Sequence, residues 1–258
     1  MDPLTSSPII HVAHLSKRFD NILAVNDLSF SIAPGEMVGL LGPNGAGKTT
    51  VLQLLLGLTT PTAGEVRIFG YNVQHQRQAI LQRVNFASAY MSLPSNLTVR
   101  ENLTVFARLY GLRKAQKKIQ ALLDVFDLSH VYEHLTGALS SGQLTRVHLC
   151  KALLNDPEVL LLDEPTASLD PAIAATVRAT LQQLQQERGI TMLYTSHNMR
   201  EIEAMCDRLI FLSRGRIITQ GTPQEVLTRA RLDSLEALFI TIARDGALHN
   251  LADAGEGR

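Results

Sequence analysis

The chain has 258 residues, 45% apolar and 19% charged, which is enough to bury a sizeable core as one large or two small domains. Lysine plus arginine and aspartate plus glutamate both total 24, so the formal net charge is zero. A nucleic-acid binder that works by neutralising phosphates usually carries a basic excess, so no nucleic-acid partner is expected.

The sequence shows no pattern typical of secretion or of a membrane span. The first ten residues, MDPLTSSPII, lack a basic stretch followed by an apolar one, so we expect no secretory signal. No 18 apolar residues run together, and any membrane role is expected to come through a partner. Cys150 and Cys206 lie in apolar, helical-looking segments without a C-x-x-C, which favours reduced, buried thiols over a disulfide or a metal site.

The first third of the chain is predicted to form an antiparallel sheet. Residues 8–32 alternate between apolar and polar side chains in two short strands, which are separated by the polar turn Asp20-Asn21. Val66–Phe69 and the glycine after it indicate a further strand and turn. We expect this sheet to lie beside the strand predicted at Met37–Leu41.

A phosphate-binding loop follows that strand. Residues Gly42–Thr49 read GPNGAGKT, with the spacing G-x-x-x-x-G-K-T, and Thr50–Leu56 after them has the apolar density of a buried helix. The glycines allow a tight loop whose backbone N–H groups point at phosphate oxygens, and the N-terminus of the helix adds to the attraction. A glycine-rich turn with a solvated lysine is the alternative, and the flanking strand and helix argue against it.

The side chains of this loop have expected roles. Lys48 is expected to contact the β- and γ-phosphates of a nucleotide and to be a catalytic residue, and the Thr49 hydroxyl is expected to ligate Mg²⁺. The expected nucleotide contacts are Gly42, Pro43, Asn44, Gly45, Ala46, Gly47, Lys48, Thr49 and Thr50.

The middle of the chain is predicted to be helical. Between Val99 and Leu154, apolar residues recur at helical spacing on two faces, one with Leu103, Phe106, Leu109 and Tyr110 and the other with Ile119, Leu122, Leu123 and Phe126. We therefore expect a helical subdomain, at about residues 90–155, inserted into the domain.

Buried strands return in the last third. Val159–Leu162 and Ile190–Thr195 are apolar runs separated by a helical segment, Ala172–Glu187, which is typical of a βαβ unit with parallel strands. Arg208–Thr219 predicts a hairpin with an Arg-Gly turn.

These elements predict a single domain of the α/β class. It is expected to cover residues 8–240, and residues 241–258, polar and rich in small residues from Asp245 onward, are expected to form a loosely held tail.

Two acidic residues end the strand Val159–Leu162. Asp163 and Glu164 follow it directly, and carboxylates at the carboxyl end of such a strand are expected beside the phosphate loop. Asp163 is suited to holding Mg²⁺ through its water shell, and Glu164 can polarise an attacking water. Solvated acids at a strand end are the alternative for the pair alone, and the phosphate loop upstream argues against it.

Three further segments resemble one protein family. Leu139–Gln143 reads LSSGQ, Leu160–Asp170 reads LLLDEPTASLD, and Thr195–His197 reads TSH. Together with the phosphate loop they resemble the ATP-binding subunit of an ABC transporter, over about residues 8–240. The resemblance implies an ATPase that uses ATP and Mg²⁺, with a P-loop NTPase core, a mainly parallel sheet, an N-terminal antiparallel β subdomain and an inserted helical subdomain.

The resemblance places a signature loop at the start of a helix. It implies that this loop faces the γ-phosphate held by a second ATP-binding subunit, so a homo- or heterodimer with two-fold symmetry is expected. A hydroxyl, backbone amides and a helix N-terminus make such a loop an anion site. Its residues are Ser140, Ser141, Gly142 and Gln143.

Three single residues also gain a role from the resemblance. His197 is implied to be the switch histidine, a catalytic residue that hydrogen-bonds the γ-phosphate. Phe19 lies where the family has an aromatic residue stacked on adenine, with an ordinary core aromatic as the alternative. Asp170 either works across the dimer interface, as part of the D-loop, or caps the helix that begins at Pro171.

The chain departs from the family at two positions. The signature usually has glycine in the place of Ser141, whose side chain now lies where a backbone amide should approach phosphate. The glutamine expected shortly before Leu97–Leu103 (LTVRENL) is replaced by Ala89, which can neither ligate Mg²⁺ nor position water. Either Ser88, Tyr90 or a water substitutes, or the other catalytic residues carry more of the reaction. We expect slower or more tightly coupled hydrolysis.

The resemblance also implies transport. An integral membrane permease, separately encoded, is expected to dock near Ala87–Leu93, in the groove between the core and the helical subdomain. The chain would then be held peripherally at the cytoplasmic face of the membrane. Ser234–Ile240 (SLEALFI) resembles an ending seen in exporter ATPases of the daunorubicin-resistance type, with an ordinary amphipathic helix as the alternative. This segment favours export.

Two other function classes stay open at this point. A soluble ABC ATPase without transport usually carries two cassettes in one chain or a long coiled-coil insertion, and this sequence shows neither pattern. A degenerate regulatory cassette with weak hydrolysis is suggested by Ala89 and Ser141. The presence of Glu164 and His197 argues against it.

Overall fold

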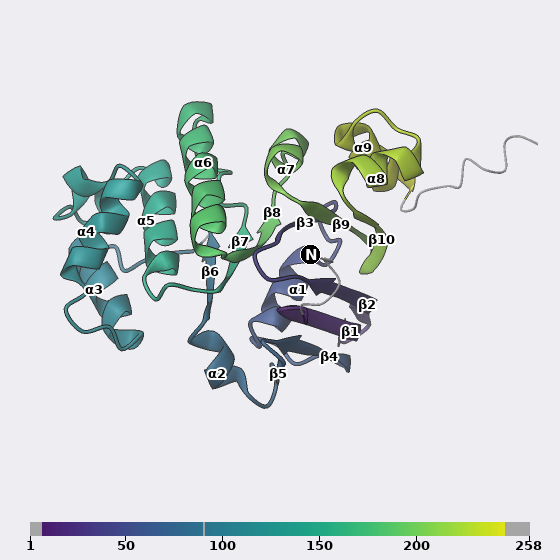
Figure 1. Cartoon of the computed structure of the whole chain (residues 1–258), viewed down its shortest axis with the longest axis horizontal. Helices are drawn as coiled ribbons and strands as arrows, with labels where there is room; N and C mark the ends of the chain where they lie inside the picture. Colours follow the sequence, from purple (N-terminus) through teal and green to yellow (C-terminus); the bar gives the residue numbers. More distant parts are fainter. Residues whose placement is uncertain (1–6, 90, 246–258) are drawn as a thin grey trace, which may run out of the picture.

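Two sheets form the framework of the protein, seen in a computed structural model that describes residues 7–89 and 91–245 (Figure 1). The strands are β1 (Ile10–Phe19), β2 (Ile22–Ile32), β3 (Met37–Leu41), β4 (Ala63–Ile68), β5 (Tyr71–Asn72), β6 (Val84–Ser88), β7 (Val159–Asp163), β8 (Thr191–Thr195), β9 (Arg208–Ser213) and β10 (Arg216–Gly221). One sheet is antiparallel with the order β2-β1-β4-β5, and the other has the order β10-β9-β3-β8-β7-β6. In the second sheet only β10 among these strands runs antiparallel to its neighbour.

Helices pack around the second sheet, and those between residues 99 and 153 form a group at one end of it (Figure 1). They are α1 (Lys48–Leu55), α2 (Arg77–Leu81), α3 (Val99–Leu109), α4 (Gln116–Val125), α5 (Ser141–Leu153), α6 (Pro171–Arg188), α7 (Met199–Met205), α8 (Pro223–Ala230) and α9 (Leu235–Asp245). Local sequence fixes several helix starts. Thr98 and Glu101 form a capping box at α3, and Ser140 and Gln143 form another at α5.

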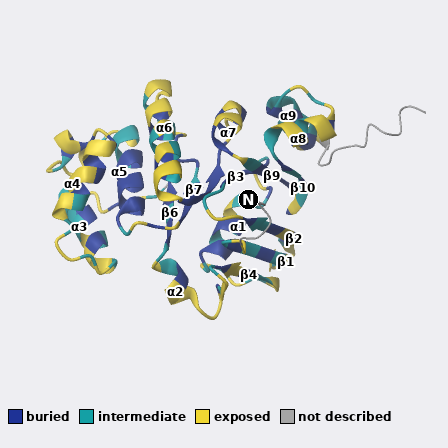
Figure 2. Cartoon of the chain, viewed as in Figure 1, coloured by how far each residue is buried: buried dark blue, intermediate teal, exposed yellow. Residues whose placement is uncertain are grey.

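The parallel strands of the second sheet, β3 and β6 to β9, are buried on both faces, as expected for parallel strands covered by other elements. Along β7, Leu160 and Leu162 point into a core shared with α5, α6 and α7, whereas Val159 and Leu161 point into a core shared with α1 and the antiparallel sheet. Figure 2 shows the central strands buried and the outer faces of the helices exposed. Period-two alternation therefore divides one strand between two cores.

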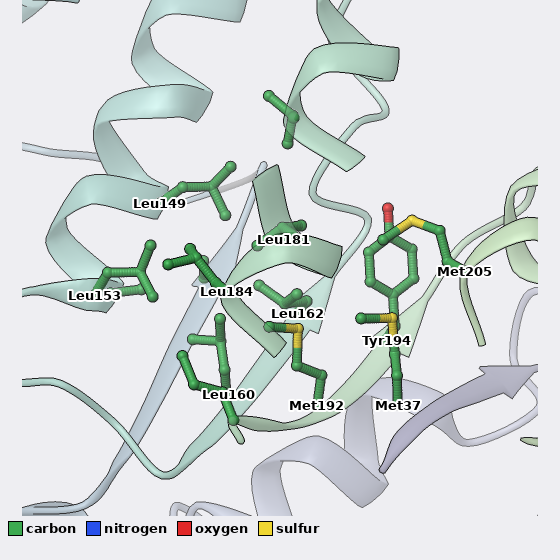
Figure 3. Close-up of a cluster of buried hydrophobic side chains, with 14 of the residues drawn as sticks. Met37, Leu149, Leu153, Leu160, Leu162, Leu181, Leu184, Met192, Tyr194 and Met205 are labelled. Carbon is green, nitrogen blue, oxygen red and sulfur yellow. The ribbon is translucent and has the colours of Figure 1, made fainter. Parts of the chain in front are cut away.

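The first of these cores joins the helical group to the sheet (Figure 3). Side chains of α5 and α6 meet those of β7 and β8, and the labelled members of this cluster are fully or almost fully buried: Met37, Leu149, Leu153, Leu160, Leu162, Leu181, Leu184, Met192, Tyr194 and Met205. Cys150 and Cys206 are buried free thiols, as predicted.

The predicted fold class is confirmed, with differences in detail. The antiparallel front sheet, the parallel core, the helical insertion and the hairpin are all present. The predicted start of the tail at residue 241 is wrong, because α9 continues to Asp245 and Ile242 is fully buried. Residues 246–258 lie outside the described part. In the described ranges, no helix combines the length and apolarity needed to cross a membrane.

The core makes one prediction about stability. Leu160→Ala removes a fully buried side chain from β7 and should lower the free energy of unfolding by about 2–5 kcal/mol. Leu109→Ala is the matched control, because Leu109 is 73% exposed on α3 and its loss should change that free energy by about 0.5 kcal/mol or less. Urea unfolding measures both, and equal losses would contradict the packing described here.

Candidate functional site

The site lies at the edge of the second sheet where the parallel strands end. The register places Ser88, Asp163 and Thr195 side by side at the carboxyl ends of β6, β7 and β8. In open α/β sheets this edge is where ligands bind. One difference from expectation is that β8 lies between the phosphate-loop strand β3 and the acidic strand β7, so the two motifs meet across a third strand.

The phosphate loop is tightly enclosed by the backbone around it. Gly42 has φ +144° and Gly47 has φ +106°, and a Cβ would lie 2.2 Å from the Leu212 carbonyl oxygen at the first and 2.6 Å from the Ala24 carbonyl oxygen at the second. Only glycine fits such positions. Gly215, in the β9–β10 turn, donates its backbone N–H to the Ala46 carbonyl at 3.0 Å, so two hairpins brace the loop from outside.

Lys48 is held at the centre of the loop. Its ammonium donates to the Gly42 carbonyl at 2.5 Å and to the Pro43 carbonyl at 3.2 Å. Burial lowers the pKa of Lys48, and the carboxylates of Glu164 and Asp163 act in the opposite direction. A partly desolvated cation is prepared for an anionic partner, because little hydration has to be removed when phosphate arrives.

A cavity of about 780 Å³ opens over this loop. Its lining comprises Ile22, Leu23, Ala24, Asn44, Gly45, Ala46, Gly47, Lys48, Thr49, Thr50, Leu52, Gln53, Leu56, Leu58, Phe86, Ser88, Met91, Asp163, Glu164, His197 and Arg214. The predicted loop residues from Asn44 to Thr50 are thus together with the predicted acidic pair and histidine. Gly42 and Pro43 form the base beneath them, where their carbonyls accept from Lys48.

The donors that could hold Mg²⁺ line the same cavity. Thr49 contributes a hydroxyl and Asp163 a carboxylate, and oxygen ligands of this kind are those that Mg²⁺ prefers. Thr195 fixes Asp163 by donating its hydroxyl to a carboxylate oxygen at 2.8 Å. A small number of protein oxygens is sufficient for Mg²⁺ that is also bound by phosphate, so these residues fit the metal.

Glu164 combines burial with an unusual backbone. Its φ is +52°, in the left-handed region, and its backbone N–H donates to both the carbonyl and the hydroxyl of Thr195 at 3.2 and 3.0 Å. The residue is 7% exposed, and among the described residues its Oε1 atom accepts no hydrogen bond. Burial raises the pKa of Glu164, while nearby His197 opposes the rise. A carboxylate with a raised pKa and a free lone pair is suited to accept a proton from water.

His197 lies against Glu164. Its Nε2 atom is 3.3 Å from Glu164 Oε1, and its backbone N–H donates to Glu164 Oε2 at 3.3 Å. The imidazole is about half exposed at the rim of the cavity, so its ring can reach a ligand placed there.

The base-binding end of the cavity is only partly as predicted. Phe19 is 42% exposed and is not part of the cavity lining, but its hairpin partner Ile22 is. Lys17 holds its ammonium 4.7 Å from the centre of the Phe19 ring. Arg214, at the β9–β10 turn, also lines the cavity and was not identified from the sequence as a site residue. At this place the sequence indicated only a hairpin turn, from its Arg-Gly pair.

The signature loop lies apart from this cavity, because none of its four residues belongs to the lining. Ser140 is exposed and uses its hydroxyl to accept from the Gln143 backbone N–H at 3.2 Å, while Gln143 accepts from the Ser140 N–H at 3.0 Å. Ser141 is exposed beside them. A Cβ on Gly142 would lie 3.3 Å from Leu169, so the loop packs closely against the segment after Glu164.

Asp170 and Ala89 each have a clear structural position. Asp170 caps α6 and accepts from the backbone N–H groups of Ala172 and Ile173 at 3.1 and 3.0 Å, which supports the capping alternative. Ala89 follows β6 and is not part of the cavity lining, whereas Ser88 before it is. Tyr90, the other residue considered as a substitute for the missing glutamine, lies outside the described residues.

Comparison with known proteins agrees with this geometry. Residues 25–167 match the ABC transporter family. Nod factor export ATP-binding protein I of Burkholderia lata is 43% identical over 220 residues, which is 84% of this chain and 72% of that protein. The protein of the same name from Rhizobium sp. strain N33 is 40% identical over 224 residues, which is 86% of this chain and 73% of that protein.

Solved structures show the same arrangement. An ATP-binding subunit of an ABC transporter gives a TM-score of 0.84 at 27% identity, covering 91% of this chain and 99% of that one. CbiO1 of Clostridium perfringens, part of the ABC transporter complex cbiONQ, gives 0.77 at 27% identity, covering 93% and 97%. The chain belongs to the ABC transporter family, as an ATP-binding subunit that hydrolyses ATP.

Proposed function

We propose that this chain powers export through a separately encoded membrane permease, with one catalytic centre built on the cavity described above. The proposed catalytic centre is supported by one observation: the phosphate loop, Asp163, Glu164 and His197 all line that cavity. Export is supported by relatives 40–43% identical whose names describe export ATP-binding proteins, and by the segment Ser234–Ile240. That segment spans the start of α9.

The residues divide the chemistry between them. Lys48 and the loop amides hold the β- and γ-phosphates, and bound Mg²⁺, kept by Thr49 and Asp163, would offset charge on the phosphate oxygens. Glu164 accepts a proton as the water oxygen bonds to the γ-phosphorus. The bond to the bridging oxygen breaks, leaving ADP and inorganic phosphate. His197 donates a hydrogen bond to a γ-phosphate oxygen, and Phe19, beside Ile22, stacks on the base at the open end.

Two chains complete two such centres in this proposal. The signature loop, Ser140–Gln143, begins α5, and its capping box uses the backbone N–H groups of Ser140 and Gln143. The N–H groups of Ser141 and Gly142 remain at this helix N-terminus as an anion site, away from the phosphate-loop cavity of the same chain. A second ATP-binding subunit, the same or different, would place its nucleotide there. The side chain of Ser141 is exposed and can rotate away from the bound phosphate, so it does not block the approach of the nucleotide to the loop.

The permease is proposed to dock in a groove of about 1000 Å³ between α2 and the end of α3. Ala87 and Leu93, near the predicted docking point, are buried and cannot contact a partner directly. The groove lies near Ala87, because Asn85, two residues before it on β6, bonds to two groove residues, accepting from the Tyr110 hydroxyl at 3.0 Å and donating to Asn155 at 2.6 Å. Docking there would hold the chain at the cytoplasmic face of the membrane.

The proposed general base gives a direct test. Glu164→Gln should lower the turnover of MgATP by about 10²–10⁴-fold, because the amide cannot take the proton from water. The affinity for MgATP should stay close to that of the wild type, since the phosphate loop is unchanged. Turnover is followed by phosphate release and affinity by a fluorescent ATP analogue. Full activity in this variant would remove Glu164 from the proposed role.

The position of the missing glutamine gives a second test. Ala89→Gln should raise turnover in the assembled transporter by about twofold to tenfold, the worth of one net hydrogen bond to water or metal. Ala243→Gln, on the exposed face of α9, introduces the same side chain far from the cavity and should leave the rate unchanged. An unchanged rate in Ala89→Gln would show that the substitution has no catalytic consequence.

The docking proposal is tested by purification from membranes. The tagged chain should bring down a multi-span membrane protein, and Leu109→Glu should abolish this by placing a charge in the groove. Val125→Glu is the control, because Val125 is also exposed, on α4, and does not line the groove. If the wild type brings down no such protein while binding MgATP normally, the result contradicts the docking proposal and favours the alternative, an ABC ATPase without transport.

A further inference from the structure

A carboxylate outside the catalytic cavity is buried more deeply than Glu164. Glu201, in the first turn of α7, is 4% exposed. We propose that Glu201 is a positioning residue for hydrolysis, which holds the His197 turn and the segment after Glu164 in one fixed arrangement. The inference rests on the roles proposed above for Glu164 and His197.

Both oxygens of Glu201 are occupied. Oε1 accepts from the Thr166 hydroxyl at 2.7 Å and from the Tyr194 hydroxyl at 2.5 Å, and Oε2 accepts from the Ser196 hydroxyl at 2.9 Å. The guanidinium of Arg178 on α6 lies 3.7 Å from Oε1. A buried charge is tolerated when its lone pairs are filled and a cation is near, and this side chain meets both conditions.

One arm of the network defines the turn that carries His197. The Ser196 hydroxyl donates to Glu201 and accepts from the Asn198 backbone N–H at 3.1 Å, so it bridges the residues on either side of His197. The Asn198 side chain in turn accepts from the Glu201 backbone N–H at 3.4 Å. These hydrogen bonds attach the turn to the Glu201 carboxylate, and the His197 imidazole is directed toward Glu164.

The other arm reaches the segment that follows Glu164. Thr166 is two residues beyond Glu164, and its carbonyl accepts from the Leu169 N–H at 3.0 Å, while Ala167 donates to the Glu164 carbonyl at 3.2 Å. Holding the Thr166 hydroxyl fixes this turn from Glu164 toward Asp170. A single carboxylate thus connects the acid, the histidine turn and, through Arg178, the helix that Asp170 caps.

Tyr194 separates a positioning role from a merely stabilising one. Its ring belongs to the buried cluster of Figure 3, and its hydroxyl joins the same Glu201 oxygen as Thr166 does. Removing it takes away one hydrogen bond to the carboxylate and a 3.5 Å contact with the Thr166 hydroxyl. Thr166 and Ser196 keep their own shorter bonds to Glu201, so both catalytic segments stay attached. Tyr194→Phe is therefore the matched control for Thr166→Val and Ser196→Ala, each of which removes one hydroxyl from the network.

The test uses the full-length protein and single-turnover hydrolysis of MgATP. Glu201→Gln, Thr166→Val and Ser196→Ala should each lower the maximal rate by about tenfold or more, as expected when a catalytic group is displaced. The MgATP concentration at half-maximal rate should change by less than about twofold, because the phosphate loop is untouched. Tyr194→Phe should keep a rate within about twofold of the wild type.

Three outcomes would overturn the inference: an unchanged maximal rate in Glu201→Gln, equal losses in Tyr194→Phe and Thr166→Val, or a loss that follows the melting temperature across all four variants. If Glu201→Gln fails to fold, the maximal rates of Thr166→Val and Tyr194→Phe can still be compared, and a loss in Thr166→Val alone supports the positioning role. Wild-type rates in Glu164→Gln and His197→Ala would instead mean that the proposed catalytic roles fail.

Discussion

The structure depends on one constraint, that parallel strands bring their carboxyl ends to the same edge of a sheet. Residues far apart in the chain become neighbours there, because Gly42 follows β3, Asp163 ends β7 and Ser196 follows β8. Strands buried on both faces carry few polar side chains, and those they carry are hydrogen-bonded inside the protein, as Asn85 and Tyr194 are. The position open to a phosphate or metal ligand is therefore at or just past the carboxyl end of each strand.

This constraint explains how much could be predicted from the sequence. The phosphate loop, Asp163, Glu164 and His197 are local signals, since each follows an apolar run that can be recognised by itself. Arg214 lies in a hairpin turn and Ile22 begins β2 just after one, and both line the same cavity, so their positions depend on the order of strands in two sheets. Strand order is a long-range property that no local pattern encodes, which is also why β8 between β3 and β7 was not foreseen.

Helix ends show the same limit on a smaller scale. The start of α6 was predicted within one residue, because Asp170 and Pro171 are a local capping signal that the structure uses. The start of the tail was placed too early, at residue 241. Ile242 continues the helical apolar spacing of Leu235 and Leu238, and its full burial shows that α9 packs on the core beyond that point.

Two buried glutamates show how environment separates roles within one site. Glu164 has an oxygen that accepts no hydrogen bond among the described residues, and burial raises its pKa, so it gains by taking a proton. Glu201 accepts hydrogen bonds at both oxygens and has a guanidinium nearby, so neither oxygen is left without a partner. A proton acceptor must stay incompletely bonded, so the Glu164 carboxylate has fewer hydrogen bonds that fix its position. The fully bonded Glu201, tied to both neighbouring segments, supplies the rigidity that Glu164 cannot supply for itself.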